Sequence, residues 1–149
     1  MQNAKNVWVW VGVVVVVIIL IAWASAVLTP RKAVPAGPTA VFAPKGQLVP
    51  QFPKELIVDS KAAVAGSYSI SYATSTNQYS ASYLSSSTVL SLYGKYKTYF
   101  SGNGWTMGQW PAPSSAFAAL GAVQDGNKVQ VSIVAEGKQT QVTVNYVGK

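Results

Sequence analysis

The sequence of 149 residues contains no cysteine and no histidine, and only 10% of its residues are charged. A chain without cysteine forms no disulfides and offers no thiolate, and it is compatible with either redox compartment. Without cysteine and histidine, the usual ligands of zinc and haem iron are also missing. We therefore expect no cofactor and no metal site.

Acidic residues are scarce as well, because the chain contains only four, which are Glu55, Asp59, Asp125 and Glu136. Asp125 and Glu136 fall in predicted hairpin turns, where acids favour the turn geometry and are solvated. We expect Glu55 and Asp59 to be solvated residues at the start of the folded domain. No two carboxylates have the spacing of a metal-binding loop. A catalytic serine needs a lysine or an amine as its partner when histidine is absent, and no sequence pattern here pairs a lysine with a serine. The sequence therefore predicts a protein that is not an enzyme.

The positive charge is concentrated near the N-terminus. The formal net charge is +7, but four of the basic residues, Lys5, Arg31, Lys32 and Lys45, precede residue 50. From there onward seven lysines stand against four acids, which leaves +3 and no arginine. Arginine is the residue that clamps phosphates and reads guanine through two hydrogen bonds. A scattered and mildly basic surface without it predicts no nucleic-acid partner.

One long apolar run occupies residues 7–28, VWVWVGVVVVVIILIAWASAVL, and contains no charge. As a helix these residues span roughly 33 Å, which is enough to cross the hydrocarbon core once. In hydrocarbon only a helix satisfies its backbone hydrogen bonds within one segment. The sequence therefore predicts a tail at 1–6, a transmembrane helix at 7–28 and the lipid bilayer as a partner. The predicted membrane-interface residues are Trp8, Trp10, Trp23, Arg31 and Lys32.

Two features of this region leave alternatives open. Lys5 and the Ala24-Ser25-Ala26 pattern are also typical of a signal peptide that is cleaved after Ala26. The apolar run is longer than the usual core of such peptides, so we expect a retained signal-anchor. Counting basic residues on either side leans weakly toward a cytoplasmic C-terminus. The Ser-, Thr- and Tyr-rich, charge-poor body favours the opposite, and we expect a cytoplasmic N-terminus and an extracytoplasmic domain at the cell membrane.

Residues 29–53 contain six of the eight prolines, which excludes a regular helix or a central strand. Fully extended as polyproline II, these residues reach roughly 75 Å. We interpret them as a proline-rich spacer between the membrane and a domain at 54–149. A spacer alone has no need of large apolar residues, so several of them are predicted to bind a partner, namely Val41, Phe42, Leu48, Val49 and Phe52.

Beyond the spacer, the hydrophobic pattern predicts strands first and then one helix. Tyr68, Ile70 and Tyr72 alternate with small polar residues, and a second alternation contains Tyr79, Ala81 and Tyr83, so we expect a hairpin. A helix is predicted from Thr88 to about Gly102, with Ser87 as its N-cap. Its apolar face has spacings of three and four residues and consists of Val89, Leu92, Tyr93, Tyr96, Tyr99 and Phe100.

The C-terminal third reads as strands. A short strand is expected within 105–110, followed by strands at 116–124, 128–135 and 139–147. Asp125-Gly126 between two alternating segments is typical of a tight hairpin. One face of these strands is apolar and requires a cover, which the helix supplies. The predicted fold class is α+β, with a small antiparallel sheet of about five or six strands and one helix packed on one face.

The helix ends in the pattern Tyr93-x-x-Tyr96-x-x-Tyr99-Phe100-x-x-x-Gly104-Trp105, between a polar strand and a β-meander. This arrangement resembles small α+β domains of uncharacterised bacterial proteins that are anchored by a single membrane pass. Their helix also ends in an aromatic pair followed by Gly-Trp. The resemblance covers residues 54–149. It implies the fold and an exported location, and it brings no activity.

Together these features predict a non-catalytic, membrane-anchored binding or scaffolding protein, which acts as an accessory subunit of a larger membrane or envelope complex. Other membrane or envelope proteins are the expected partners. The alternative is a domain that binds a glycan or a small ligand through exposed aromatics. The aromatic candidates are Tyr68, Tyr79, Tyr83, Trp105 and Trp110. Of these, we expect Trp105 to fill the core at the end of the helix. Trp110 is predicted to be exposed and is a further candidate for binding a partner.

A pilin-like filament subunit is a lesser alternative, because pilins also join an N-terminal apolar helix to a small β-rich domain. Two features of the sequence argue against it. No glutamate lies near the start of the apolar run, and Pro30 ends the helix where a pilin helix would continue into the head.

Overall fold

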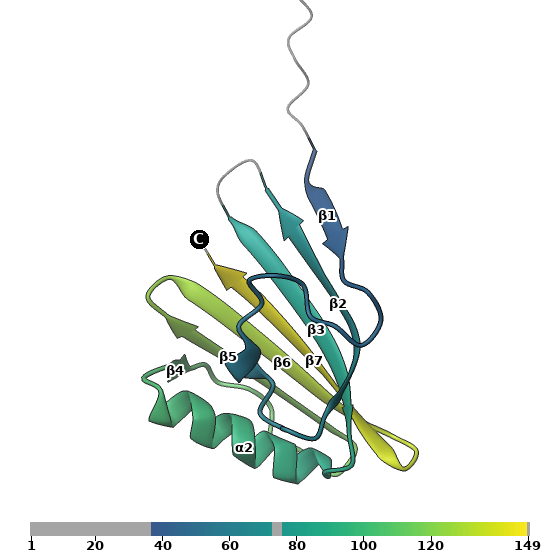
Figure 1. Cartoon of the computed structure of the whole chain (residues 1–149). Helices are drawn as coiled ribbons and strands as arrows, with labels where there is room; N and C mark the ends of the chain where they lie inside the picture. The colour runs from purple at the N-terminus through teal and green to yellow at the C-terminus, as the bar shows by residue number, and fades with distance from the viewer. Residues whose placement is uncertain (1–36, 73–75, 149) are drawn as a thin grey trace, which may run out of the picture. The chain divides into compact units, whose positions relative to one another are not determined.

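The computed structural model describes residues 37–72 and 76–148. The segments with alternating polar and apolar side chains form strands of an antiparallel sheet. Within these residues the sheet has seven strands in the order β1-β2-β3-β7-β6-β5-β4 (Figure 1). The elements are β1 (Thr39–Phe42), η1 (Lys54–Leu56), β2 (Ala63–Ser71), β3 (Asn77–Ser85), α2 (Val89–Gly102), β4 (Thr106–Met107), β5 (Phe117–Gln124), β6 (Asn127–Glu136) and β7 (Gln139–Gly148). The α+β class is confirmed. The expected five or six strands are too few, because β1 lies in the segment predicted as spacer.

The hairpin between β5 and β6 turns where the sequence predicts it. Gln124 pairs with Asn127, so the turn consists of Asp125 and Gly126 alone. Both residues have positive φ, 50° and 83°. Two consecutive residues of positive φ are characteristic of a type I′ turn, whose twist matches that of the flanking strands.

Helix α2 buries the predicted face against the sheet, through Val89, Leu92, Tyr96 and Phe100. Its N-cap is Thr88, whose side-chain oxygen accepts a hydrogen bond from the backbone N–H of Ser91 at 3.3 Å. The predicted N-cap, Ser87, is therefore wrong by one residue. The backbone carbonyl of Ser87 instead accepts a hydrogen bond from the Thr140 hydroxyl at 2.7 Å, which ties the start of the helix to β7.

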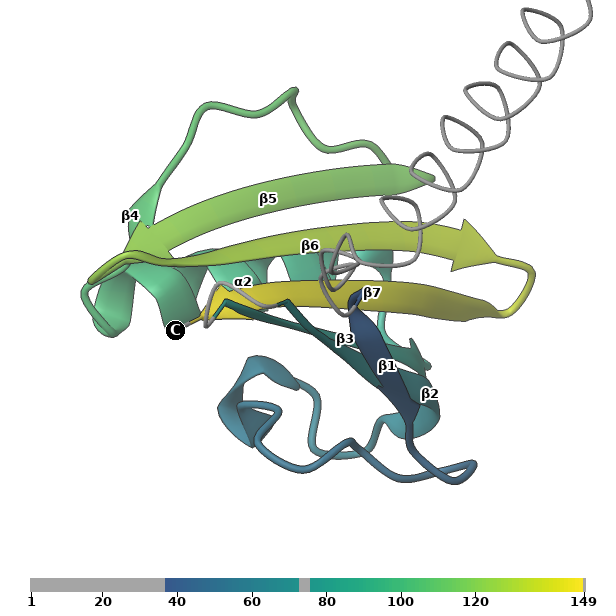
Figure 2. The ribbon, with the colours of Figure 1, turned by 90° about the horizontal axis from the view of Figure 1, so that it is seen from above.

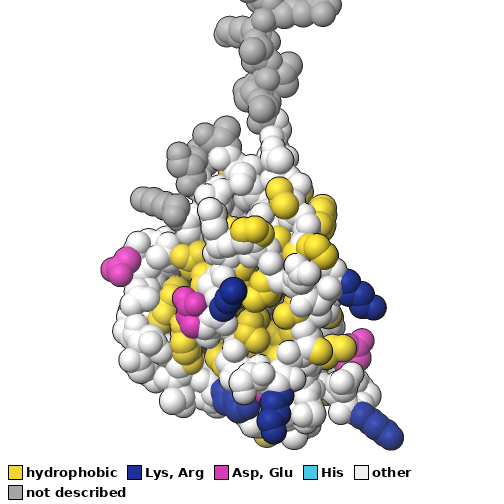
Figure 3. Space-filling view, in the orientation of Figure 1, with side chains coloured by type: hydrophobic (Ala, Val, Ile, Leu, Met, Phe, Trp, Pro, Cys, Tyr) yellow, Lys and Arg dark blue, Asp and Glu magenta, His cyan; other side chains and the backbone are white. Residues whose placement is uncertain are grey.

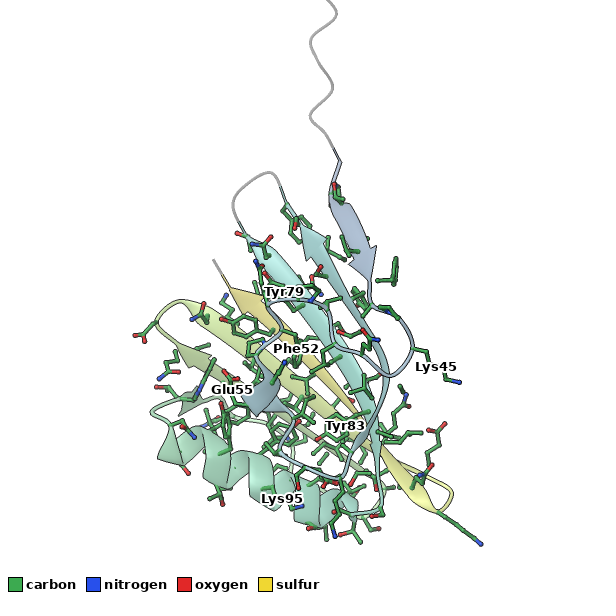
Figure 4. The ribbon with its side chains drawn as sticks, viewed as in Figure 1. Lys45, Phe52, Glu55, Tyr79, Tyr83 and Lys95 are labelled. Atoms are coloured by element: carbon green, nitrogen blue, oxygen red, sulfur yellow. The ribbon has the colours of Figure 1, made fainter. Side chains whose placement is uncertain are left out.

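The segment 43–62 crosses the same face of the sheet as α2 and completes its cover (Figure 1, Figure 4). Val49, Phe52 and Leu56 are 2%, 4% and 1% exposed and belong to the hydrophobic core. The Tyr79 hydroxyl donates to the side-chain oxygen of Gln51 at 2.9 Å. The expected domain boundary at residue 54 is therefore too late. Proline excludes a helix or a central strand from this segment, but it permits an edge strand and an irregular cover.

Two buried tyrosines connect the sheet, helix α2 and segment 43–62. The hydroxyls of Tyr83 on β3 and Tyr96 on α2 lie 2.9 Å apart, and that of Tyr96 donates to the Leu56 carbonyl at 2.7 Å. Burial raises the pKa of Tyr83 to about 12 and raises the pKa of Tyr96 as well. Both groups are therefore neutral, and their hydrogen bonds attach η1 to the helix and the sheet.

Asp59 is buried, at 8% exposure, although the sequence predicted a solvated residue. The Ser85 hydroxyl donates to one of its carboxylate oxygens, and the backbone N–H of Lys61 donates to the other at 3.2 Å. The hydrogen bond from Ser85 is the main cause that lowers the pKa of this carboxyl. Asp59 is therefore a structural residue that fastens the end of segment 43–62 to β3.

The face drawn in Figure 3 is the one covered by α2 and segment 43–62. Apolar side chains gather in its middle, between the segment and the helix.

The predicted tail and the predicted membrane helix at residues 7–28, with their interface residues, lie outside the described residues. In the part of the chain that the structure describes, no helix is long and apolar enough to cross a bilayer.

Candidate functional site

The second face of the sheet, here called the outer face, is the one opposite α2. Figure 2 looks onto this face of β5, β6 and β7, with α2 behind them. Cross-strand pairing aligns one residue from each of five neighbouring strands in a single row across it. In strand order from β2 to β5 the row is Tyr68, Ser80, Asn145, Gln130 and Gly121.

A groove of about 750 Å³ lies along this row and is here called the outer groove. Tyr68 lines one end and Trp110 the other. Three amide side chains lie between them, those of Gln78, Asn145 and Gln130. Lys128 is the only charged residue among the described residues that line the groove. Apolar residues, among them Val123 and Val147, line the groove as well. The site therefore combines two aromatic ends with a nearly neutral middle that carries both amide and apolar side chains.

The position of Trp110 depends on a glycine. After β4 the backbone N–H of Gly108 donates to the Gly121 carbonyl at 2.9 Å, which holds the chain beside β5. The indole then covers Gly121. A Cβ atom at position 121 would lie only 2.7–3.0 Å from three ring atoms of Trp110. Any side chain at this position would displace the indole. Trp110 is 40% exposed, so its exposure agrees with the prediction, and its role in binding stays a prediction.

The opposite end of the groove is built by β1 and β2. Tyr68 lies beside Phe42, with ring centroids 5.8 Å apart. The Tyr72 hydroxyl donates to the side-chain oxygen of Gln78 at 3.2 Å. Phe42 is 74% exposed and extends the aromatic end beyond Tyr68.

The residues of β2 face the opposite way from what their hydrophobicity suggests. Tyr68 and Ile70 lie on the outer face, because they pair with Ser80 and Gln78. Ser67 faces the core instead and is 6% exposed. Its hydroxyl donates to the Ser80 carbonyl at 2.9 Å and accepts from the Val49 N–H at 3.2 Å. A small polar residue is needed here because segment 43–62 passes close to β2.

The predicted partner-binding residues separate into two groups. Val49 and Phe52 are buried, and Leu48 packs against the core, so these three are not available to a partner. They are apolar because they cover the sheet of their own domain. Val41 and Phe42 are exposed on β1 and remain candidates.

Three of the five aromatic candidates also belong to the core. Tyr79 and Tyr83 are 8% and 0% exposed. Trp105 packs on Phe100 with ring centroids 5.8 Å apart, at the end of the helix, where the sequence predicts it. Only Tyr68 and Trp110 therefore reach the outer groove.

The outer groove is lined by neutral polar, apolar and aromatic side chains and by one lysine. No acid lies among the described residues that line it. No group of three residues that could hold a metal ion occurs within residues 37–72 and 76–148. The amides each supply both donors and acceptors, and the aromatic rings supply apolar surface. Such a site suits an uncharged polar ligand with some apolar faces.

The described residues form an α+β domain with a seven-stranded antiparallel sheet and a groove on its outer face. Comparison of the chain with models of known families, with curated proteins and with solved structures gives no match in any of the three. The resemblance to bacterial membrane-anchored domains therefore stays a prediction.

Proposed function

We propose that this domain is a non-catalytic binding module of a membrane-anchored protein and that the outer groove holds an extended polar ligand of the cell envelope. The observation that carries the proposal is the row across the sheet. It runs from Tyr68 to Gly121, where the indole of Trp110 lies, and the amides of Asn145 and Gln130 are between them. Because the row residues belong to paired strands, their backbones are fixed before a ligand arrives. Preorganisation of this kind reduces the entropy cost of binding.

The two aromatic ends are suited to binding for a further reason. Tyr and Trp present large rigid surfaces with only two side-chain torsions, so little conformational entropy is lost when they make a contact. The indole of Trp110 already rests on Gly121. A ligand can therefore use its remaining surface without first ordering it.

The predicted anchor determines where such a ligand would be found. The described domain begins at residue 37 and β1 at Thr39, so the predicted spacer shortens to residues 29–38. These ten residues reach roughly 30 Å when fully extended. The outer groove would therefore lie close to the membrane surface, within reach of envelope polymers.

The proposal is tested with the full chain in mild detergent and with fractions of the envelope of the cells that make it. Trp110→Ala and Tyr68→Ala should each weaken binding at least tenfold, about 1.4 kcal/mol. The matched control is Phe117→Ala, an aromatic residue that is 47% exposed on β5 and does not line the groove. This control should bind like the wild type. Equal binding by all four proteins, or no binding of any fraction, would refute the proposal.

An accessory subunit of a larger complex is the second candidate function, and a different observation favours it. Val41 and Phe42 are 51% and 74% exposed on β1, which is one of the two edge strands of the described sheet. Exposed apolar residues on a sheet edge are typical of surfaces that bind another protein. Native-mass analysis of gently extracted membranes should then find the chain in a large complex, and Phe42→Ser should release it. A small free species in the wild type would remove this candidate.

A further inference from the structure

We infer that the ligand of the outer groove is a linear glycan chain that runs across the strands from Tyr68 to Trp110. The inference rests on the proposed function, because it names the ligand class of that same site. It follows from the length of the row, the chemistry of its middle and the orientation of its aromatic ends.

The length of the row sets the length of the ligand. Tyr68 lies on β2 and Gly121, beneath Trp110, lies on β5, with three strands between them. Neighbouring strands lie about 4.8 Å apart, so four steps cover roughly 19 Å, which is about four pyranose rings in an extended chain. A mono- or disaccharide could touch one aromatic end only. A chain of four or more rings could touch both ends at once.

The middle of the groove matches sugar hydroxyls. A hydroxyl both donates and accepts hydrogen bonds, and the amides of Asn145 and Gln130 do the same. These two residues are direct cross-strand partners, so their side chains start about 5 Å apart. Gln78 adds an amide nitrogen, since its oxygen is already bonded to Tyr72. Neutral donors and acceptors on three neighbouring strands suit the repeated hydroxyls of a polyol.

The aromatic ends match the apolar faces of sugar rings. A pyranose ring presents C–H groups on its two faces, and these pack on flat aromatic surfaces. Three atoms of the Trp110 indole, Nε1, Cε2 and Cζ2, approach the position of a Cβ on Gly121, so this edge of the ring lies against the glycine. Trp110 is 40% exposed, so part of its ring is available for stacking. Gly121 is therefore a positioning residue, which acts on the ligand through Trp110.

Other polymers fit the groove less well. Single-stranded nucleic acid would need several cations along its phosphates, and Lys128 is the only charged residue among the described ones that line the groove. Protein interfaces concentrate apolar, aromatic and arginine side chains in a fully buried centre. Here three amides, those of Gln78, Gln130 and Asn145, lie beside Val123 and Val147 in an open groove, and the aromatic residues are at the two ends.

Two fractions of the envelope distinguish a glycan from a protein ligand. One is polysaccharide freed of protein, and the other is the protein extract freed of polysaccharide. The full chain in mild detergent should bind the polysaccharide, and Trp110→Ala should weaken this binding at least tenfold. If only the protein extract binds in a manner that depends on Trp110, the inference is refuted and the proposed function stands. If neither fraction does so, both are refuted.

Chain length and the positioning glycine complete the test. The polysaccharide is cut by partial acid hydrolysis and separated by size, and affinity is measured by titration calorimetry. Affinity should rise up to about four rings and then level off, and Tyr68→Ala should remove most of this rise. Gly121→Ala should behave like Trp110→Ala. Its matched control is Gly94→Ala on α2, where an added Cβ meets nothing within 4 Å. Affinity independent of length, or unchanged in Gly121→Ala, would overturn the inference.

Discussion

Replacing Tyr96 by phenylalanine tests whether segment 43–62 is part of the fold. The substitution removes a hydroxyl that contacts Tyr83 at 2.9 Å and the Leu56 carbonyl at 2.7 Å, all in the core. The ring remains, so no cavity larger than one oxygen atom forms. Two buried polar groups lose their partner, at a cost of about 1–2 kcal/mol each, so the free energy of unfolding should fall by about 2–4 kcal/mol.

The assay is urea denaturation of the full chain in mild detergent, followed by near-ultraviolet circular dichroism. The control is Tyr93→Phe, which removes the hydroxyl of a partly buried tyrosine on the same helix and should cost less than about 0.5 kcal/mol. The double variant Tyr83→Phe/Tyr96→Phe should lose less than the two single variants combined, because it removes both partners of one hydrogen bond. A loss in Tyr96→Phe as small as that in Tyr93→Phe would refute the attachment of η1 to the helix.

Two further predictions concern the same segment. Phe52→Ala should destabilise the domain by about 3–5 kcal/mol because Phe52 is 4% exposed, whereas Phe42→Ala, at a position that is 74% exposed, should cost less than about 0.5 kcal/mol. Similar losses of thermal stability in both variants would contradict the revised boundary. The hydrogen bond from Ser85 lowers the pKa of Asp59 in the folded state. The carboxylate therefore stabilises the fold at pH values above the unfolded pKa of about 3.9. This contribution is lost as the pH falls through the lower pKa of the folded state. The stability difference between the wild type and Asp59→Asn should therefore shrink as pH is lowered from about 5 to about 2, and a constant difference over this range would contradict the account.

The features that were predictable from the sequence are those with a local cause. The turn at Asp125 and Gly126 follows from the preference of these residues for positive φ. Helix α2 follows from apolar spacings of three and four, which bury Leu92 and Tyr96 as expected. The sequence-based prediction of its N-cap was wrong by one residue, because serine and threonine are both good N-caps and Ser87 directly precedes Thr88.

The features that were missed depend on contacts between distant parts of the chain. Val49 lies on the core because Ser67, 18 residues later, accepts a hydrogen bond from its N–H. Composition alone cannot distinguish a segment that covers the sheet from a spacer, because both are rich in proline and contain apolar residues. The inward orientation of Ser67 has the same cause.

The outer groove could not be predicted from local sequence patterns either. Trp110 was identified as exposed from its polar and proline neighbours. Its position over Gly121 depends on how β4 joins β5, and the alignment of Asn145 with Gln130 depends on the register of β6 and β7. Register becomes visible only when the whole sheet is assembled.

Photo-crosslinking in intact cells tests most directly whether the outer face is the binding face. A benzophenone amino acid would replace Gln130, an exposed residue in the middle of the outer groove, and in a second protein Leu90, which is 51% exposed on α2 at the opposite side of the sheet. Irradiation should yield a crosslinked product of higher mass from position 130 and none from position 90. A product from position 90 alone, or equal yields from both positions, would contradict the account.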